Sequence, residues 1–378
     1  MRVIGLMTGT SMDGIDAALI ETDGEYHIER LETASLRYET DFKLALKTAE
    51  QYINQHSETV SQLTEITQQS AEYHIDVINL LLKKLTHPYH IDLIGYHGQT
   101  LYHNPAKKIT LQIANPHYLS QQFNLPVIYD FRSADIQNGG QGAPLAPLYH
   151  QALMIQKKLD HLVVINCGGI SNISIIAGKK YEDILGGFDT GPGNVLLDQF
   201  VHNWTNQKYL IDYNGEFASQ GKIDFEFLDI LYQKTTLNSY YLKPPPKSLD
   251  SRDIIYIDNI EQRFPKDNIQ NLYDGCATLA AFTAYTLSQS ILDYADIKNI
   301  VISGGGAKNP AIIQSLKLFL PEHILLHTAD EFGWSTTYME AELIAWLAVR
   351  SIKKLPLSIP QTTGVKFPVT GGQFVYPI

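Results

Sequence analysis

The chain has 378 residues, of which 44% are hydrophobic and 18% are charged, so it can bury the cores of two or three domains. Its 29 Lys and Arg against 40 Asp and Glu give a net charge of −11 without a basic or acidic tail, which argues against binding to nucleic acid or an anionic membrane. The two cysteines, Cys167 and Cys276, are far apart, which argues against a disulfide framework and a zinc site. With no export signal and no apolar run of the roughly 20 residues that a membrane span needs, we expect a cytoplasmic protein.

Apolar runs and periodic apolar residues predict a β-rich α/β lobe in the first third of the chain. Three successive strands come first, then two helices, and then two further strands that are separated by a short hairpin and a helix. The strands and longer helices are expected, in chain order, at residues 3–7, 15–22, 26–38, 42–53, 60–85, 91–96 and 125–129. The Gly- and Pro-rich stretch 133–147 suits a functional loop or a crossing between domains, so we place the N-terminal lobe at 1–132.

The opening pattern of three strands repeats in the second half of the chain. A helix, a polar and irregular insert, a long helix, a strand and a final helix follow. These elements are expected at residues 161–166, 170–177, 180–188, 195–204, 209–266, 273–294, 299–302 and 338–353. We therefore expect two similar lobes, with 133–365 as the C-terminal lobe and the tail 366–378 completing the N-terminal lobe.

Each lobe has a turn of small residues between its first two strands. In the first turn, Gly9 to Asp16, small residues allow the backbone to approach oxyanions, and Asp13 could hold a metal through water. The turn is not a Walker P-loop, because G-x-x-x-x-G-K-[ST] occurs nowhere in the chain. The second turn, Asn166 to Asn172, supplies backbone donors, a hydroxyl and two amides. Either turn alone could be a simple hairpin turn, but the two together favour a polyphosphate ligand.

A third motif, residues 187–194, lies at the end of a predicted strand and just before a predicted helix, and places glycines around a proline at the helix start. Asp189 stands at the strand end. A phosphotransferase needs a carboxylate that takes a proton from the attacking group, so Asp189 is our candidate general base. The alternative is that Asp189 caps the helix or the Gly-Pro turn.

The fourth motif, Gly304 to Pro310, joins a strand to a helix. Three consecutive glycines cost backbone entropy and leave a flat surface, which favours close approach of a ligand over chance. We expect adenosine to occupy this slot.

Polar residues at strand ends and in the crossing loop could address a second substrate. Arg132 suits a carboxylate, which it can grip with two hydrogen bonds. The alternatives are that His97 is a hydrogen-bonded strand-end histidine and that Asp130 and Arg132 form an internal ion pair. The set is His97, Gln99, Thr100, Asp130, Arg132, Asn138, Gln141 and Gly142.

Seven motifs, in the family's order and across essentially the whole chain, resemble those of the anhydro-N-acetylmuramic acid kinase family. They are residues 5–16, 97–100, 130–132, 141–145, 166–172, 188–194 and 303–309. The resemblance implies the hexokinase, Hsp70 and actin superfold, which is a two-lobed α/β actin-like ATPase (ribonuclease H-like) fold with an ATP cleft between the lobes. It also implies ATP with Mg²⁺, a homodimer, and a role in peptidoglycan recycling.

The resemblance further implies an unusual reaction, in which 1,6-anhydro-N-acetylmuramic acid is opened by water and phosphorylated at O6. Asp189 would deprotonate the water that attacks the anomeric carbon, and the released O6 would attack the γ-phosphate. Glu340 matches a carboxylate near the sugar. It has lower weight, because Thr336 and Thr337 stand where the family usually has Pro-Asp.

The resemblance assigns the remaining site residues by position. Mg²⁺ is expected with ATP, held through water by Asp13 or Asp189. The residues expected to bind ATP are Gly9, Thr10, Ser11, Met12, Asp13, Gly14, Ile15, Asp16, Asn166, Gly168, Gly169, Ser171, Asn172, Gly304, Gly305, Gly306 and Asn309. The residues expected to bind the sugar are His97, Gln99, Thr100, Asp130, Arg132, Gln141, Gly142, Thr190, Gly191 and Asn194.

Two other functions remain open at this stage. An ordinary hexose kinase of the same fold would use the base on a substrate hydroxyl and would open no ring. A non-enzymatic actin-like or Hsp70-like module would use ATP to control a protein partner. The polar strand-end residues argue against the second alternative, because a partner-binding switch does not need them.

Overall fold

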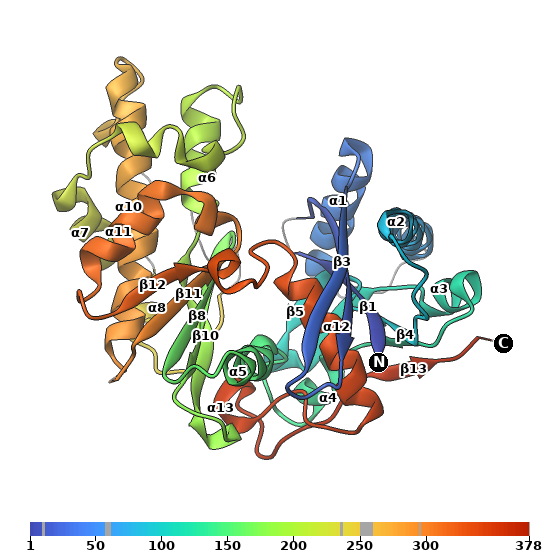
Figure 1. Ribbon diagram of the computed structural model, residues 1–378. Coiled ribbons are helices and arrows are strands. Elements are labelled where there is room, and N and C mark those ends of the chain that lie inside the picture. Colours follow the sequence, from blue (N-terminus) through green and yellow to red (C-terminus); the bar gives the residue numbers. More distant parts are fainter. Residues whose placement is uncertain (10–11, 57–61, 235–236, 250–259, 295, 378) are drawn as a thin grey trace. The chain divides into compact units, whose positions relative to one another are not determined.

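A computed structural model describes residues 1–9, 12–56, 62–234, 237–249, 260–294 and 296–377 (Figure 1). The chain divides into two compact units. The first consists of Met1–Leu159 together with Tyr338–Ile378, and the second of Asp160–Thr337. In the described part of the chain, no helix has the length and apolar character that a bilayer crossing requires.

The first unit is built on a six-stranded sheet in the order β13-β7-β4-β1-β2-β3. β1, β2 and β3 form an antiparallel meander, β4 and β7 run parallel to β1, and β13 pairs antiparallel with β7. The strands are β1 (Arg2–Thr8), β2 (Gly14–Thr22), β3 (Ile28–Arg37), β4 (Leu93–Tyr96), β7 (Val127–Tyr129) and β13 (Gln373–Val375), and a separate hairpin is formed by β5 (Gln99–Asn104) and β6 (Ile109–Ile113).

Helices cover both faces of this sheet. A Cβ on Gly5 would collide with the carbonyl oxygen of Ala341, so α12 (Met339–Ile352) lies directly on β1. Successive strand residues point to opposite faces, and the neighbours of Gly5, Ile4 and Leu6, pack on the other side with residues of α1 (Thr40–His56) and α2 (Gln62–Lys84). The other helices of the unit are α3 (Pro116–Phe123), α4 (Ser133–Gln137), α5 (Ala146–Gln156) and α13 (Pro360–Thr363).

The second unit is built on a five-stranded sheet in the order β10-β9-β8-β11-β12. Its strands are β8 (Leu162–Cys167), β9 (Ile170–Ile176), β10 (Ile184–Pro192), β11 (Asn299–Ser303) and β12 (Leu325–Thr328). Figure 1 shows helices α6, α10 and α11 beside this sheet, and their apolar residues share one core with it. The helices are α6 (Val195–Trp204), α7 (Phe225–Lys234), α8 (Asn238–Tyr241), α9 (Ile260–Arg263), α10 (Ile269–Leu292) and α11 (Pro310–Phe319).

The two sheets have the same topology. If the hairpin β5–β6 and the edge strand β13 are set aside, each unit orders its strands third, second, first, fourth, fifth, with the first three antiparallel and the last two parallel to the first. This is the ribonuclease H-like arrangement of actin-like ATPases, so the predicted fold class is confirmed. The predicted ATP cleft between the lobes stays a prediction.

The unit boundaries differ from the expected lobes. Residues 133–159 and 338–365, which we expected in the C-terminal lobe, belong to the first unit. The reason is α12, which packs on β1 and holds α5 through a hydrogen bond from the Tyr149 hydroxyl to Glu342 Oε2 (2.8 Å). Both helices are buried on most sides, so their sequences do not indicate which sheet they cover.

Two segments that we expected to be irregular contain helices. In the stretch 133–147, α4 begins where Asp130 Oδ1 accepts the Ser133 N–H (3.2 Å), and α5 follows from Ala146. In the insert 209–266, Asp224 caps α7 by accepting the Phe227 N–H (3.0 Å). These short polar caps stabilise helices that are too brief to show a clear period in the sequence.

Candidate active site

The candidate site residues fall into two groups, one in each unit. In the second unit, the turn between β8 and β9 packs against the turn between β10 and α6. Gly193 N donates to Gly169 O (2.8 Å), and Asn194 donates to Gly168 O through both its backbone N–H (2.8 Å) and its side-chain amide (3.0 Å). A Cβ on Gly193 would collide with Gly168 O, so only glycine allows this approach. The sequence motifs 166–172 and 187–194 are therefore brought together.

The Gly304 to Gly306 motif joins the same cluster. Gly304 has a φ of +80°, and a Cβ there would lie 2.6 Å from Asn166 Oδ1. A Cβ on Gly306 would strike the Cys167 sulfur. By contrast, a Cβ on Gly169 would meet no atom within 4 Å, and Gly305 is exposed. The cluster thus combines tight internal packing with two stretches of bare backbone that a flat or anionic ligand can approach.

Several predicted ATP and sugar residues of this unit have structural partners instead. Ser171 and Thr190 are fully buried, and the Thr190 hydroxyl donates to Ser171 O (3.2 Å). Asn309 is also buried and caps α11 by accepting the Ala311 N–H (3.0 Å). Gly191 has a φ of +153° at a bulge of β10. These residues shape the turns, and the side chains of Ser171, Thr190 and Asn309 are not presented to solvent.

Asp189 lies within β10, paired with Asn172 of β9, whereas we expected it at the end of the strand. Its Oδ2 accepts the N–H of Leu249 (2.8 Å), while α6 begins at Val195 without a side-chain cap. The alternative that Asp189 caps this helix is therefore wrong. Burial raises the pKa of Asp189 from 3.8 to about 6, against the opposing effect of the Leu249 hydrogen bond.

In the first unit, the turn from Gly9 to Asp16 joins β1 to β2. Thr10 and Ser11 lie outside the described residues. Gly9 O accepts hydrogen bonds from Met12 N (3.2 Å) and from the Gln99 side-chain amide (3.0 Å). Met12 and Ile15 point into the core, and Gly14 lies against the backbone of Leu36. The turn is thus fixed at its base.

Two carboxylates flank this turn. Asp13 is 63% exposed and forms an ion pair with Lys43. Asp16 accepts a hydrogen bond from the Ser35 hydroxyl (2.5 Å). Both are hard oxygen ligands of the kind that Mg²⁺ prefers.

His97 and Arg132 form the centre of the polar set. Arg132 Nε donates to His97 Nε2 (3.0 Å), and Arg132 Nη1 donates to Gly142 O (2.7 Å). His97 Nδ1 lies 2.8 Å from Gly98 O, so it carries the ring proton. Burial and the Arg132 charge lower the pKa of His97 to about 3, so the ring is neutral. The interpretation of His97 as a hydrogen-bonded strand-end histidine is confirmed, and its neutral ring orients Arg132.

The predicted alternative of an Asp130–Arg132 ion pair is wrong. Asp130 accepts hydrogen bonds from Ser133 N (3.2 Å) and from the Gln373 amide (2.7 Å), so it anchors α4 and β13. The Arg132 guanidinium has five N–H groups and uses two of them on His97 and Gly142, which leaves donors for a ligand.

The crossing loop is held by a residue that the sequence did not single out. Asp135 is buried and accepts the Gly142 N–H (2.6 Å) and the Thr363 hydroxyl (2.6 Å). The backbone of Gln141 is also fixed, by Thr363 O (2.7 Å) and His103 (2.9 Å), whereas its side chain has no hydrogen bond within the described residues. Thr100 accepts from the Gln112 amide (3.3 Å). The Gln141 amide is therefore available to a ligand.

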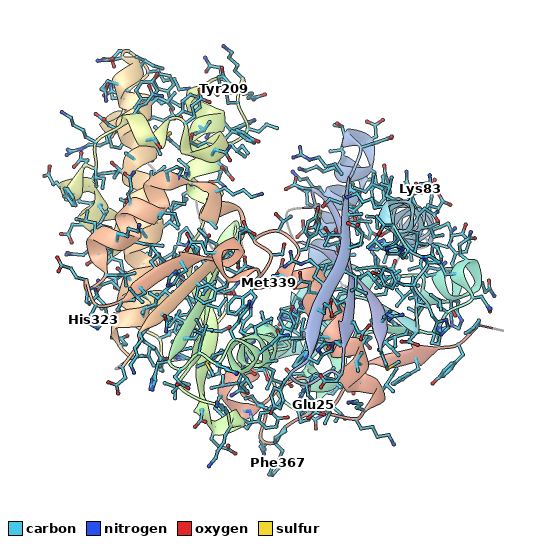
Figure 2. The ribbon with its side chains drawn as sticks, in the orientation of Figure 1. Glu25, Lys83, Tyr209, His323, Met339 and Phe367 are labelled. Atoms are coloured by element: carbon cyan, nitrogen blue, oxygen red, sulfur yellow. The ribbon has the colours of Figure 1, made fainter. Side chains whose placement is uncertain are left out.

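Glu340 follows Met339, which Figure 2 labels at the start of α12. Glu340 is exposed, and desolvation by the surrounding protein nevertheless raises its pKa, with the Arg132 charge acting in the opposite direction and the Asp16 charge adding to the increase. Within the first unit, the charges of Arg132 and Asp16 thus act in opposite directions on the pKa of Glu340.

The Thr336-Thr337 departure from the family pattern has a structural role. Thr336 N and Oγ1 donate to Asp330 (3.2 and 2.5 Å), and Thr336 O accepts the Gly304 N–H (3.0 Å). Thr336 therefore supports the glycine motif of the second unit.

Three comparisons with known proteins bear on the chain. A sequence model of the family described as "Anhydro-N-acetylmuramic acid kinase" matches residues 1–377. A curated protein of that name from Rhodopseudomonas palustris (strain ATCC BAA-98 / CGA009) is 38% identical over 386 residues and covers 100% of both chains. Another, from Pelagibacter ubique (strain HTCC1062), is 35% identical over 382 residues and covers 98% of this chain and 97% of its own.

Among solved structures, a ROK family glucokinase from Streptomyces griseus in complex with glucose and AMPPNP matches with a TM-score of 0.42 and 13% identity, over 92% of this chain and 98% of that chain. Component A of the (R)-2-hydroxyglutaryl-CoA dehydratase of Acidaminococcus fermentans matches with a TM-score of 0.46 and 12% identity, over 92% and 99% of the two chains. These TM-scores are low, and the fold assignment rests on the strand order of the two sheets.

Proposed function

The chain belongs to the anhydro-N-acetylmuramic acid kinase family, and from this premise we propose that it uses ATP to open 1,6-anhydro-N-acetylmuramic acid with water and to phosphorylate O6. The products are N-acetylmuramic acid 6-phosphate and ADP, and the reaction serves peptidoglycan recycling. The observation that carries the catalytic assignment is Asp189, a partly buried carboxyl in β10 with a pKa raised to about 6.

Asp189 acts as the general base. Above pH 6 its carboxylate is mostly ionised and still basic enough to accept a proton, which is the compromise that general-base catalysis favours. Asp189 takes a proton from water as the water oxygen bonds to C1. The C1–O6 bond breaks, O6 keeps the electron pair and attacks the γ-phosphorus, and the bond to the β-phosphate oxygen breaks to release ADP. The proton on Asp189 then returns to solvent.

Arg132 and Gln141 bind the sugar. Muramic acid carries a carboxylate, and the guanidinium of Arg132 has donors beyond those bonded to His97 and Gly142. The Gln141 amide suits a sugar hydroxyl or the acetamido group. Glu340, whose pKa is raised by desolvation against the opposing effect of the Arg132 charge, is the second carboxylate of the proposed site, after Asp189.

The bare backbone at Gly169 and Gly305 and the turn from Gly9 to Asp16 bind ATP. The described residues contain no group of three or more His, Cys, Asp or Glu that could hold a metal ion, which fits Mg²⁺, an ion usually held by one or two carboxylates together with phosphates and water. Asp13, exposed beside this turn, would hold it through water, and bound Mg²⁺ would neutralise charge on the ATP phosphates.

We also assign the protein to the cytoplasm and to a homodimeric state, as the family resemblance implies. Light scattering on the purified protein tests the dimer, since a mass near 42.5 kDa in place of about twice that value would contradict it.

One assay tests the reaction. Purified protein is incubated with ATP, Mg²⁺ and the anhydro sugar in ¹⁸O-water, and the product is analysed at once by mass spectrometry. We expect ADP that forms only when the sugar is present, and a 6-phosphorylated hexose that carries ¹⁸O at C1. The label must exceed that of a control, in which finished product is kept in ¹⁸O-water for the same time to measure exchange at C1. An ordinary hexose kinase would phosphorylate simple hexoses without C1 label, and a partner-binding ATPase would hydrolyse ATP slowly whether or not sugar is present. Either outcome contradicts the proposal.

A further inference from the structure

We propose that Lys247 is a positioning residue, which fixes the segment Tyr240–Leu249 (the strap) against Asp189 and so sets the orientation and proton affinity of its carboxylate. The inference rests on the proposed function for the chemical role of Asp189. The inference concerns how the second unit orients the Asp189 carboxylate. No sequence motif singled out Lys247.

The strap contacts Asp189 at three atoms. The Tyr240 hydroxyl donates to Asp189 O (2.7 Å), Asp189 N donates to Lys247 O (3.2 Å), and Leu249 N donates to Asp189 Oδ2 (2.8 Å). Two of these bonds hold the backbone at the β10 bulge, and the third aims the carboxylate. Asp189 Oδ1 has no hydrogen bond within the described residues and is free to accept a proton.

Lys247 holds the strap in this position. Its ammonium group donates to the carbonyl oxygens of Tyr240 (3.4 Å) and Tyr241 (3.1 Å), at the C-terminal end of α8 where a cation is favoured. The same ammonium lies over the rings of Tyr240 (5.0 Å) and Phe188 (5.4 Å), and Phe188 directly precedes Asp189 in β10. Lys247 thereby connects the start of the strap, at Tyr240 and Tyr241, with its own end of the strap and with β10, the strand that carries Asp189.

The preceding residues, Pro244 to Pro246, favour the same arrangement. Proline restricts φ and limits the conformations that the turn can adopt when it is released. Lys243, in contrast, is exposed, and its ammonium group has no hydrogen bond or ion pair within the described residues. It provides a matched control in the same segment.

The strap acts on Asp189 through hydrogen bonding. Tyr240 and Lys247 bond to the backbone of Asp189, and within the described residues its carboxylate forms no ion pair. Burial lowers the pKa of Lys247, with the Asp293 charge opposing this effect. The Leu249 N–H favours the ionised carboxylate, whereas burial favours the neutral form. Losing the Leu249 hydrogen bond while Asp189 keeps its burial therefore raises the pH at which Asp189 loses its proton.

The test compares pH profiles of kcat for Lys247→Met, Lys247→Arg and Lys243→Met. For Lys247→Met we expect the acid limb to move up by about one pH unit, the effect of losing one hydrogen bond to a charged group, so kcat falls about five-fold at pH 6 and less at pH 8. The KM for ATP stays unchanged. Lys247→Arg keeps the charge and the donors, so the acid limb of its kcat profile should lie close to that of the wild type. Lys243→Met should not shift the acid limb.

A second readout does not depend on activity. The Asp189 carboxyl is titrated by ¹³C NMR in Asp-labelled protein, with Asp189→Asn identifying its signal, and the melting temperature confirms folding. A folded Lys247→Met protein whose Asp189 titrates as in the wild type overturns the proposal, since a purely structural lysine would lower stability alone. If Lys247→Met does not fold, Tyr240→Phe replaces it, with the same direction of shift expected. If Asp189→Asn keeps its turnover, the proposed base role of Asp189 fails, while the NMR titration still decides the role of the strap.

Discussion

The two units share one strand order, yet their first turns are built differently. The turn from Gly9 to Asp16 carries two carboxylates, one of them exposed, and is fixed mainly through Gly9 O and the Gln99 amide. The turn at Gly168 and Gly169 carries no charge and is held by backbone hydrogen bonds from residues 193–195. A duplicated topology thus supplies a charged turn in one unit and a turn of bare backbone in the other. Substitutions in the first should alter charge, and substitutions in the second should alter packing.

The largest effect is expected at the reacting group of the second unit. Asp189→Asn should lower kcat by about 10² to 10⁴-fold, the usual contribution of a general base, and leave the KM for ATP nearly unchanged. Because the folded pKa of about 6 exceeds the ordinary 3.8, the ionised carboxylate costs stability that is absent below about pH 4 and fully expressed above about pH 6. Asn removes this cost, so the melting temperature at pH 7 should not fall.

Steady-state kinetics and calorimetry measure both effects. Asp229→Asn, an exposed carboxylate on α7, is the control and should behave as wild type. A fully active Asp189→Asn protein would remove Asp189 from the base role.

Two glycines of the second unit, Gly193 and Gly169, separate the effect of internal packing from the effect of ligand approach to bare backbone. Gly193→Ala places a methyl against Gly168 O and should lower the free energy of unfolding by about 1–3 kcal/mol. Gly169→Ala meets no atom within 4 Å, so its stability should be near that of the wild type, whereas its KM for ATP should rise because the methyl covers bare backbone. Urea denaturation and ATP titrations separate the two. Equal stability losses would show that the turn is not organised in this way.

The smallest effect is expected at the charged turn. Asp13→Asn breaks an ion pair with Lys43 whose partners are 63% and 34% exposed, and such pairs contribute less than about 1 kcal/mol. Stability should hardly change, while the Mg²⁺ concentration needed for half-maximal rate should rise several-fold. Asp76→Asn, an exposed carboxylate on α2, is the control. An unchanged Mg²⁺ dependence would exclude Asp13 from that role.

Local features of the fold were predictable from the sequence, and distant ones were not. The repeated strands and their turns follow from apolar runs and small residues, which act over a few positions. The unit boundary depends on Gly5 of β1 meeting Ala341 of α12, a contact that no local pattern encodes.

The same limit applies to the candidate site. The sequence singled out Asp189 and Arg132, and their roles remain predictions. It did not predict that Leu249 would hold the Asp189 carboxylate, because the hydrogen bond spans 60 residues of chain. The run Pro244 to Pro246 was a signal that this segment is conformationally restricted. Only the tertiary structure shows that this segment contacts Asp189.

The division of the chain also has a consequence for its synthesis. The second unit, Asp160–Thr337, is one continuous segment, whereas the first unit is interrupted by it. On the ribosome the second unit can complete its contacts as it emerges, but the sheet face that carries Gly5 must wait for α12, which is made after the whole second unit. The part of the protein that is translated first is therefore completed last, and the face of its sheet that carries Gly5 stays uncovered until α12 has been made.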